Sequence, residues 1–244
     1  MLKLIVFDMA GTTVKDQHEV EACFAKAAAQ TGLQVNSAQI LAMQGYSKIE
    51  VFNLLWRETA PHLNENELAQ KVQNSYLIFC NILEDYYLHA PIIPTEGCLE
   101  LFDFLRKNEI KIALTTGFYR KVTHIILDKL GWLNGLNCTY IGNSNSIIDV
   151  SIASDEVTFG RPKPDMIFKA MELLGIKNPN EVIAIGDTPS DLAAGKAAAC
   201  FKTFGLTNGT HSRGQLSDYE SDGLFQSLAE FQNYLSENSL KINN

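Results

Sequence analysis

Short apolar runs recur along the chain. They cover residues 2–7, 110–114, 181–185 and 201–204, and residues 138–141 form a weaker candidate. A run without polar alternation is typical of a strand that is buried on both faces of a sheet. We therefore predict four strands and a fifth, weaker one.

Helix-like patterns lie between these runs. Apolar residues recur at a spacing of three or four in residues 122–130 and 167–174, and they are dense in residues 99–105. Gly175 follows the second of these patterns and is a natural helix stop. Strands that alternate with helices predict an α/β fold, a doubly wound, Rossmann-like parallel sheet with helices on both faces.

Residues 15–87 have a different pattern. No strand-like run occurs there, whereas residues 19–30, 47–58 and 65–87 are helical in character. We predict a helical cap domain at 15–87, inserted directly after the first strand. The α/β core domain would then comprise residues 1–14 and 88–244.

Two further segments are expected to be irregular. Residues 143–154 are polar and predict a long surface loop, and the tail 236–244 is expected to fray.

Composition narrows the class of protein. The chain has 244 residues, of which 46% are hydrophobic, and a formal net charge of −8, as in many soluble globular proteins. The negative charge disfavours binding to nucleic acid, because the phosphates of nucleic acid attract the basic side chains of Lys and Arg. No apolar stretch approaches membrane-spanning length, so we expect no membrane association. The five cysteines are scattered without a CxxC motif, which favours reduced thiols and a cytoplasmic location.

Polar residues that can take part in catalysis or ligand binding follow the predicted strands. Asp8 begins the segment Asp-Met-Ala-Gly-Thr-Thr, and Thr116-Gly117 follows the run at 110–114. Arg161 lies in Gly-Arg-Pro-Lys-Pro-Asp, and residues 186–191 read Gly-Asp-Thr-Pro-Ser-Asp. Ligands bind at the carboxyl ends of strands in doubly wound sheets. The four segments together offer a carboxylate nucleophile, an anion cradle, a cation and acidic ligands that suit magnesium.

In this combination, the four segments resemble the motifs of the haloacid-dehalogenase superfamily. The resemblance implies that Asp8 is a covalent nucleophile that forms an aspartyl-phosphate. It implies a Mg²⁺ site made of Asp8, the carbonyl of Ala10 and Asp187, with Asp191 nearby. It also implies phosphoryl contacts, which come from Thr12, Thr116, Gly117 and Arg161. Lys163 also precedes a proline, and the sequence does not decide whether Arg161 or Lys163 contacts the phosphoryl group.

One position departs from the phosphatase pattern of that superfamily. Ala10 stands where phosphatases carry a second Asp, the general acid for the leaving alcohol. The segment at Asp8 is instead similar to the phosphonatase branch, in which a cap lysine forms a Schiff base with an aldehyde. Lys48 in Gly-Tyr-Ser-Lys-Ile-Glu resembles that lysine. Two positions depart from this branch as well, since Val51 and Phe118 replace its usual His and Tyr.

The resemblance implies a Mg²⁺-dependent hydrolase of a small phosphonate, phosphonoacetaldehyde or a related compound. Three alternatives stay open: a phosphomonoester phosphatase for a phosphoglycolate-type substrate, a haloacid dehalogenase, and a non-catalytic binder of phosphate ligands. His18 lies early in the cap and is a candidate to compensate for the missing histidine. Residues 20, 23, 24 and 27 form an apolar face that would either pack within the cap or form a homodimer contact.

Overall fold

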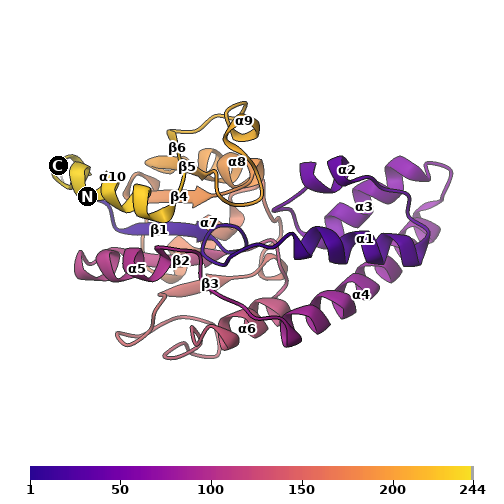
Figure 1. Ribbon diagram of the computed structural model, residues 1–244, viewed down its shortest axis with the longest axis horizontal. Coiled ribbons are helices and arrows are strands. Elements are labelled where there is room, and N and C mark those ends of the chain that lie inside the picture. Colours follow the sequence, from indigo (N-terminus) through magenta and orange to yellow (C-terminus); the bar gives the residue numbers. More distant parts are fainter. Residues whose placement is uncertain (243–244) are drawn as a thin grey trace.

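The chain is described by a computed structural model that covers residues 1–242, with side chains for residues 1–238. Its centre is a six-stranded sheet in the order β3-β2-β1-β4-β5-β6 (Figure 1). The strands are β1 (Leu4–Asp8), β2 (Lys111–Thr115), β3 (Val150–Ile152), β4 (Val182–Gly186), β5 (Lys202–Leu206) and β6 (Gly223–Phe225). All neighbouring strands are parallel. The carboxyl ends of β1, β2 and β4 therefore meet at one edge of the sheet.

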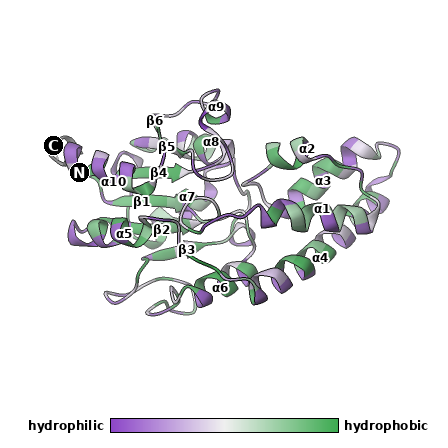
Figure 2. Ribbon diagram, in the orientation of Figure 1, coloured by the Kyte–Doolittle hydropathy of each residue, from purple (hydrophilic) through white to green (hydrophobic). Residues whose placement is uncertain are grey.

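Helices cover both faces of the sheet, as predicted. Along β1, Leu4 and Val6 pack in the cluster with α7 and α8, whereas Ile5 and Phe7 pack with α5, α6 and α10. This alternation explains why the central strands β1 and β4 are apolar along most of their length (Figure 2). The elements are α5 (Cys98–Lys107), α6 (Arg120–Lys129), η1 (Ser154–Glu156), α7 (Asp165–Leu173), η2 (Pro179–Glu181), α8 (Pro189–Ala197), α9 (Arg213–Leu216) and α10 (Leu228–Ile242).

Four helices form a separate lobe beside the carboxyl edge of the sheet (Figure 1). They are α1 (Glu19–Thr31), α2 (Ser37–Ala42), α3 (Lys48–Thr59) and α4 (Glu65–His89). Three phenylalanines form the centre of this lobe: Phe24 stacks on Phe52 with 4.2 Å between ring centroids, and Phe79 lies within 6 Å of both. The lobe thus has a hydrophobic core of its own side chains.

The lobe joins the sheet through a stem of two antiparallel segments. The N–H of Lys15 donates to the carbonyl of Ile93 at 3.1 Å, and the N–H of Thr95 donates to the carbonyl of Thr13 at 3.0 Å. Val14 and Pro94 form the antiparallel bridge between these bonds. The chain therefore leaves and re-enters the core at adjacent points, a few residues after Asp8.

Several expectations from the sequence were wrong. Residues 138–141 form no strand and contribute one isolated bridge, between Ile141 and Val150, whereas the predicted loop at 143–154 contains β3. The short strand β6 and the short helix α2 were not predicted. Helix α10 continues through the tail to Ile242, and residues 243–244 lie outside the described residues.

The first helix of the lobe carries the apolar face for which two roles were considered, packing within the cap or a homodimer contact. Val20, Cys23, Phe24 and Ala27 are all less than 9% exposed and pack within the lobe, so this face offers no free surface for a dimer. None of the helices in residues 1–242 has the length and apolar character needed to cross a bilayer.

Candidate active site

A pocket lies where the carboxyl edge of the sheet meets the helical lobe. It brings together residues from β1, the stem, the lobe and three loops of the core. Its lining consists of Asp8, Ala10, Asp16, His18, Val20, Glu21, Gln44, Gly45, Lys48, Thr116, Gly117, Phe118, Thr188 and Thr210. Five of the nine predicted catalytic, phosphoryl-binding and metal-binding residues therefore line a single pocket, namely Asp8, Ala10, Lys48, Thr116 and Gly117.

The loop after β1 is shaped by Gly11. Its φ of 88° belongs to the left-handed region, and a Cβ at this position would lie 2.1 Å from Oδ2 of Asp187. Only glycine permits both the turn and this close approach. The turn is closed by the backbone N–H groups of Thr12, Thr13 and Val14, which all donate to the carbonyl of Met9. The loop thus holds Asp8 against the loop after β4.

Three buried carboxylates converge there. Asp8, Asp187 and Asp191 each offer an oxygen atom, and these atoms lie within 4.8 Å of one another. Burial and the neighbouring Asp8 raise the pKa of Asp187 to about 7, and burial also raises the pKa of Asp8. A divalent cation would offset this concentration of negative charge, and oxygen ligands of this kind suit Mg²⁺. The donor set therefore fits a magnesium ion.

Two of the predicted ligand-binding residues, Asp191 and Thr12, already form hydrogen bonds within the protein. One oxygen of Asp191 pairs with Arg161, and the other accepts hydrogen bonds from the N–H and the hydroxyl of Thr188. Thr12 is completely buried, and its hydroxyl donates to Oδ1 of Asp187 at 3.0 Å rather than lining the pocket. Thr12 therefore orients a candidate metal ligand, a role that its prediction as a phosphoryl contact did not include.

Arg161 is the cation that reaches the carboxylates. It is 5% exposed, and its Nη2 lies 2.6 Å from Oδ1 of Asp8, while Nη1 pairs with Asp191. Its Nε is buried without a hydrogen-bond partner among the described residues. Such donors are costly to leave unpaired, and a guanidinium is well suited to phosphoryl oxygens. Lys163, by contrast, is exposed.

Lys48 begins α3 and is only 6% exposed. Burial, together with the charge of Arg161, lowers its pKa to about 8, although the charges of Asp8 and Asp16 oppose the shift. A lysine with this pKa carries a substantial fraction of neutral amine near pH 8. The amine of Lys48 is therefore prepared to act as a nucleophile, and it shares its pocket with Asp8.

The lobe packs closely on the core around Lys48. A Cβ at Gly117 would lie 2.7 Å from the carbonyl oxygens of both Gly45 and Tyr46. Nearby, the hydroxyl of Ser190 donates to the carbonyl of Gln44 at 3.1 Å. These contacts hold the turn before α3, and therefore Lys48, over the carboxyl edge of the sheet. Thr116 lies beside Gly117, and its Oγ1 accepts a hydrogen bond from the N–H of Phe118.

Several residues of the pocket were not singled out from sequence. Thr210 donates its backbone N–H to Oδ2 of Asp187 at 2.6 Å and its hydroxyl to Asp16 at 3.2 Å. It follows β5, so the rule of inspecting strand ends would have found it if applied to that strand. Asp16 lies in the stem, where no pattern of apolar residues points to it.

The sequence of the chain matches known proteins over most of its length. Residues 2–199 match the model of the haloacid dehalogenase-like hydrolases. A phosphonoacetaldehyde hydrolase of Bacillus cereus (strain AH187) is 28% identical over 237 residues, which cover 91% of this chain and 81% of that protein. Another, from Bacteroides fragilis (strain YCH46), is 28% identical over 244 residues, 97% of this chain and 86% of that protein.

Among solved structures, the fold resembles that of a phosphonoacetaldehyde hydrolase-like protein from Oleispira antarctica. The TM-score is 0.75 at 18% sequence identity, and the match covers 99% of this chain and 94% of the other. At this identity, the likeness supports the fold alone.

Proposed function

Because the chain belongs to the haloacid dehalogenase-like hydrolases, we propose that it cleaves the carbon–phosphorus bond of a small phosphonate aldehyde, phosphonoacetaldehyde or a close relative. The observation that carries this proposal is the pocket shared by Asp8 and Lys48, a carboxylate and a buried lysine whose pKa is lowered to about 8. A phosphatase has no need of a neutral amine there. An enzyme that binds an aldehyde covalently does.

The two residues would act in turn. The neutral amine of Lys48 adds to the aldehyde carbon and, with loss of water, gives a protonated imine. An oxygen of Asp8 then attacks phosphorus, and the electron pair of the breaking carbon–phosphorus bond moves into the imine to give an enamine. Protonation at carbon and hydrolysis release acetaldehyde and Lys48, and water hydrolyses the aspartyl-phosphate.

These steps explain why the site can work with an alanine, and no general acid, at position 10. An ester releases an alkoxide, which needs a proton from a general acid, whereas the departing carbon here is stabilised by the imine. The absence of a carboxylate at Ala10 is therefore compatible with catalysis. The small methyl side chain also leaves room in the pocket that Ala10 lines.

The remaining groups would hold the phosphoryl group. Arg161, whose Nε has no hydrogen-bond partner among the described residues, and the Thr116–Gly117 turn would contact the phosphoryl oxygens. Asp8 and Asp187, with the carbonyl of Ala10, would hold Mg²⁺, which supplies charge neutralisation when bound. The helical lobe would act as a cap that excludes water from this chemistry.

The proposal is tested by phosphate release with Mg²⁺ from phosphonoacetaldehyde and from a panel of phosphomonoesters. We expect release from the phosphonate by the wild type and none by Lys48→Ala, while Lys163→Ala, which removes an exposed lysine, serves as the matched control. Release from esters alone, with Lys48→Ala still active, would identify a phosphomonoester phosphatase instead. Binding of tungstate without turnover of either class would identify a non-catalytic binder.

A further inference from the structure

The pocket presents few groups that can transfer a proton near Lys48. Val51, one turn after Lys48, is 2% exposed, and Phe118, which lines the pocket, is 3% exposed, and neither can carry a proton. Imine formation nevertheless requires that the ammonium lose a proton and that a hydroxyl leave as water. Another side chain of the pocket that accepts and returns a proton would serve both steps.

Four acidic or basic side chains line the pocket besides Lys48: Asp8, Asp16, His18 and Glu21. In the proposed function, Asp8 is the nucleophile that attacks phosphorus. The charges that act on Lys48 come from Arg161, Asp8 and Asp16. Asp16 is thus the remaining carboxylate close enough to Lys48 to attract its proton electrostatically.

The carboxyl group of Asp16 is held in place from three sides. Its Oδ1 accepts the N–H of His18 at 2.8 Å, and its Oδ2 accepts the hydroxyl of Thr210 at 3.2 Å. The carboxyl of Glu19 is in hydrogen-bonding contact with it as well, and is buried, with a raised pKa that burial and Asp16 together cause. The carboxyl of Asp16 therefore has a fixed orientation in the pocket.

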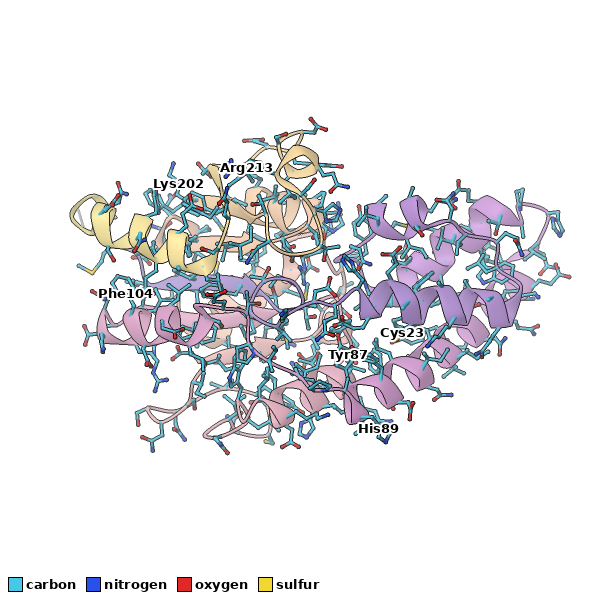
Figure 3. The ribbon with its side chains drawn as sticks, in the orientation of Figure 1. Cys23, Tyr87, His89, Phe104, Lys202 and Arg213 are labelled. Carbon is cyan, nitrogen blue, oxygen red and sulfur yellow. The ribbon has the colours of Figure 1, made fainter. Side chains whose placement is uncertain are left out.

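A tyrosine hydroxyl contacts Glu19, the carboxyl group that is hydrogen-bonded to Asp16. Tyr87, near the end of α4, donates to Oε1 of Glu19 at 2.8 Å, and the N–H of Gln17 donates to Oε2 at 2.7 Å. Figure 3 labels Tyr87 between α1 and α4, next to the stem. His18, Glu19 and the core loop at Thr210 thus contact Asp16 directly, and Tyr87 of α4 contacts it through Glu19. Glu21 and His18 have no side-chain hydrogen bond of this kind among the described residues.

We propose that Asp16 is a catalytic proton-transfer group for imine formation at Lys48, an inference that rests on the proposed function. The Asp16 carboxylate takes a proton from the Lys48 ammonium, and the neutral amine adds to the aldehyde carbon. The proton on the added nitrogen moves to the former carbonyl oxygen, which gives a neutral carbinolamine. Asp16 then returns its proton to the hydroxyl, which leaves as water. An ammonium and an aldehyde thus become a protonated imine and water, with no net proton change.

The test measures imine formation apart from phosphorus chemistry. Wild type, Asp16→Asn, Asp16→Ala and Glu21→Gln are mixed with phosphonoacetaldehyde and quenched with borohydride at short intervals. Peptide mass spectrometry then gives the fraction of Lys48 that is alkylated. We expect Asp16→Asn to slow trapping by about 10²–10⁴-fold, the usual contribution of a positioned acid or base. We expect Glu21→Gln to remain within about twofold of the wild type.

Chemical rescue separates catalysis from a structural role. If Asp16 transfers protons, added formate should restore much of the trapping rate of Asp16→Ala, because a free carboxylate can occupy the space left by the side chain. A variant that is merely misfolded would not respond to formate and would also have a lowered Tm. Trapping by the wild type with an unchanged rate in Asp16→Asn overturns this proposal alone. The absence of any trapped Lys48 in the wild type overturns the proposed function together with it.

Discussion

Replacement of Lys48 by methionine is expected to make the protein more stable at neutral pH and inactive. Methionine keeps most of the length and apolar stem of lysine but carries no charge. In the folded protein the pKa of Lys48 falls from its ordinary 10.5 to about 8, chiefly because the ammonium is buried. Burial of the charged form is therefore a cost of folding wherever the side chain is protonated.

The size of this cost follows from the two pKa values. The folded-state value lies below the unfolded one, so the unfolded chain binds more protons and the cost is fully present below about pH 8. Between 10.5 and about 8, each pKa unit is worth about 1.4 kcal/mol, which gives about 3 kcal/mol at pH 7. As the pH rises through this range, the folded protein no longer has to bury a charge. At pH 10, the difference should be below about 1 kcal/mol.

The assay is urea unfolding of wild type and Lys48→Met at pH 7 and pH 10. We expect the variant to be more stable at pH 7 by about 3 kcal/mol, or roughly 6–12 °C in Tm for a chain of this length. The control is Lys26→Met, an exposed lysine on α1, which should change stability by less than about 0.5 kcal/mol at either pH. A stability gain that is equal at pH 7 and pH 10, or a loss at pH 7, would refute the reasoning from burial.

Other perturbations test other parts of the site. Phosphate release should rise with pH through about pH 8, as Lys48 loses its proton in the field of Arg161, Asp8 and Asp16, and a pH–rate profile of kcat/KM that is flat from pH 6 to 9 would contradict this. Asp187→Asn should weaken Mg²⁺ affinity at least 10-fold by isothermal calorimetry, because it removes one of three clustered carboxylates, and equal affinity would exclude it as a ligand. Phe52→Ala should destabilise the protein by about 3–5 kcal/mol in urea unfolding, since Phe52 is fully buried between Phe24 and Phe79, and a loss below about 1 kcal/mol would mean that the lobe adds little to global stability.

The central strands could be predicted from sequence because burial on both faces leaves an uninterrupted apolar run. β1, β2 and β4 have this property. β3 does not, since it is three residues long with Ser151 at its centre and follows a polar loop. The run at 138–141 is apolar only at intervals and lies in a turn region, where Ile141 forms an isolated bridge with Val150. Short edge strands depend on their neighbours more than on their own composition.

The candidate site was predictable where it follows strand ends and unpredictable where it depends on packing. Asp8 and Asp187 follow buried strands, so their convergence could be inferred from topology. Nothing in the sequence decides between Arg161 and Lys163, which lie two residues apart; the fold alone buries the first and exposes the second. The burial of Lys48 likewise depends on how α3 meets the core. Asp16 could not be found at all, because its role arises from the meeting of the stem with Thr210.

The two-segment stem gives the helical lobe the character of a replaceable cassette. Its hydrogen bonds between Lys15 and Ile93 and between Thr13 and Thr95 place the two ends of the inserted segment next to each other. An insertion whose ends already meet can be lengthened, shortened or exchanged without moving the strands on either side. The core would keep the phosphorus chemistry, while each new cassette would bring its own residue to face the leaving group. An exchange of the lobe at these two points would therefore change the residues that face the leaving group and leave the strands of the core in place.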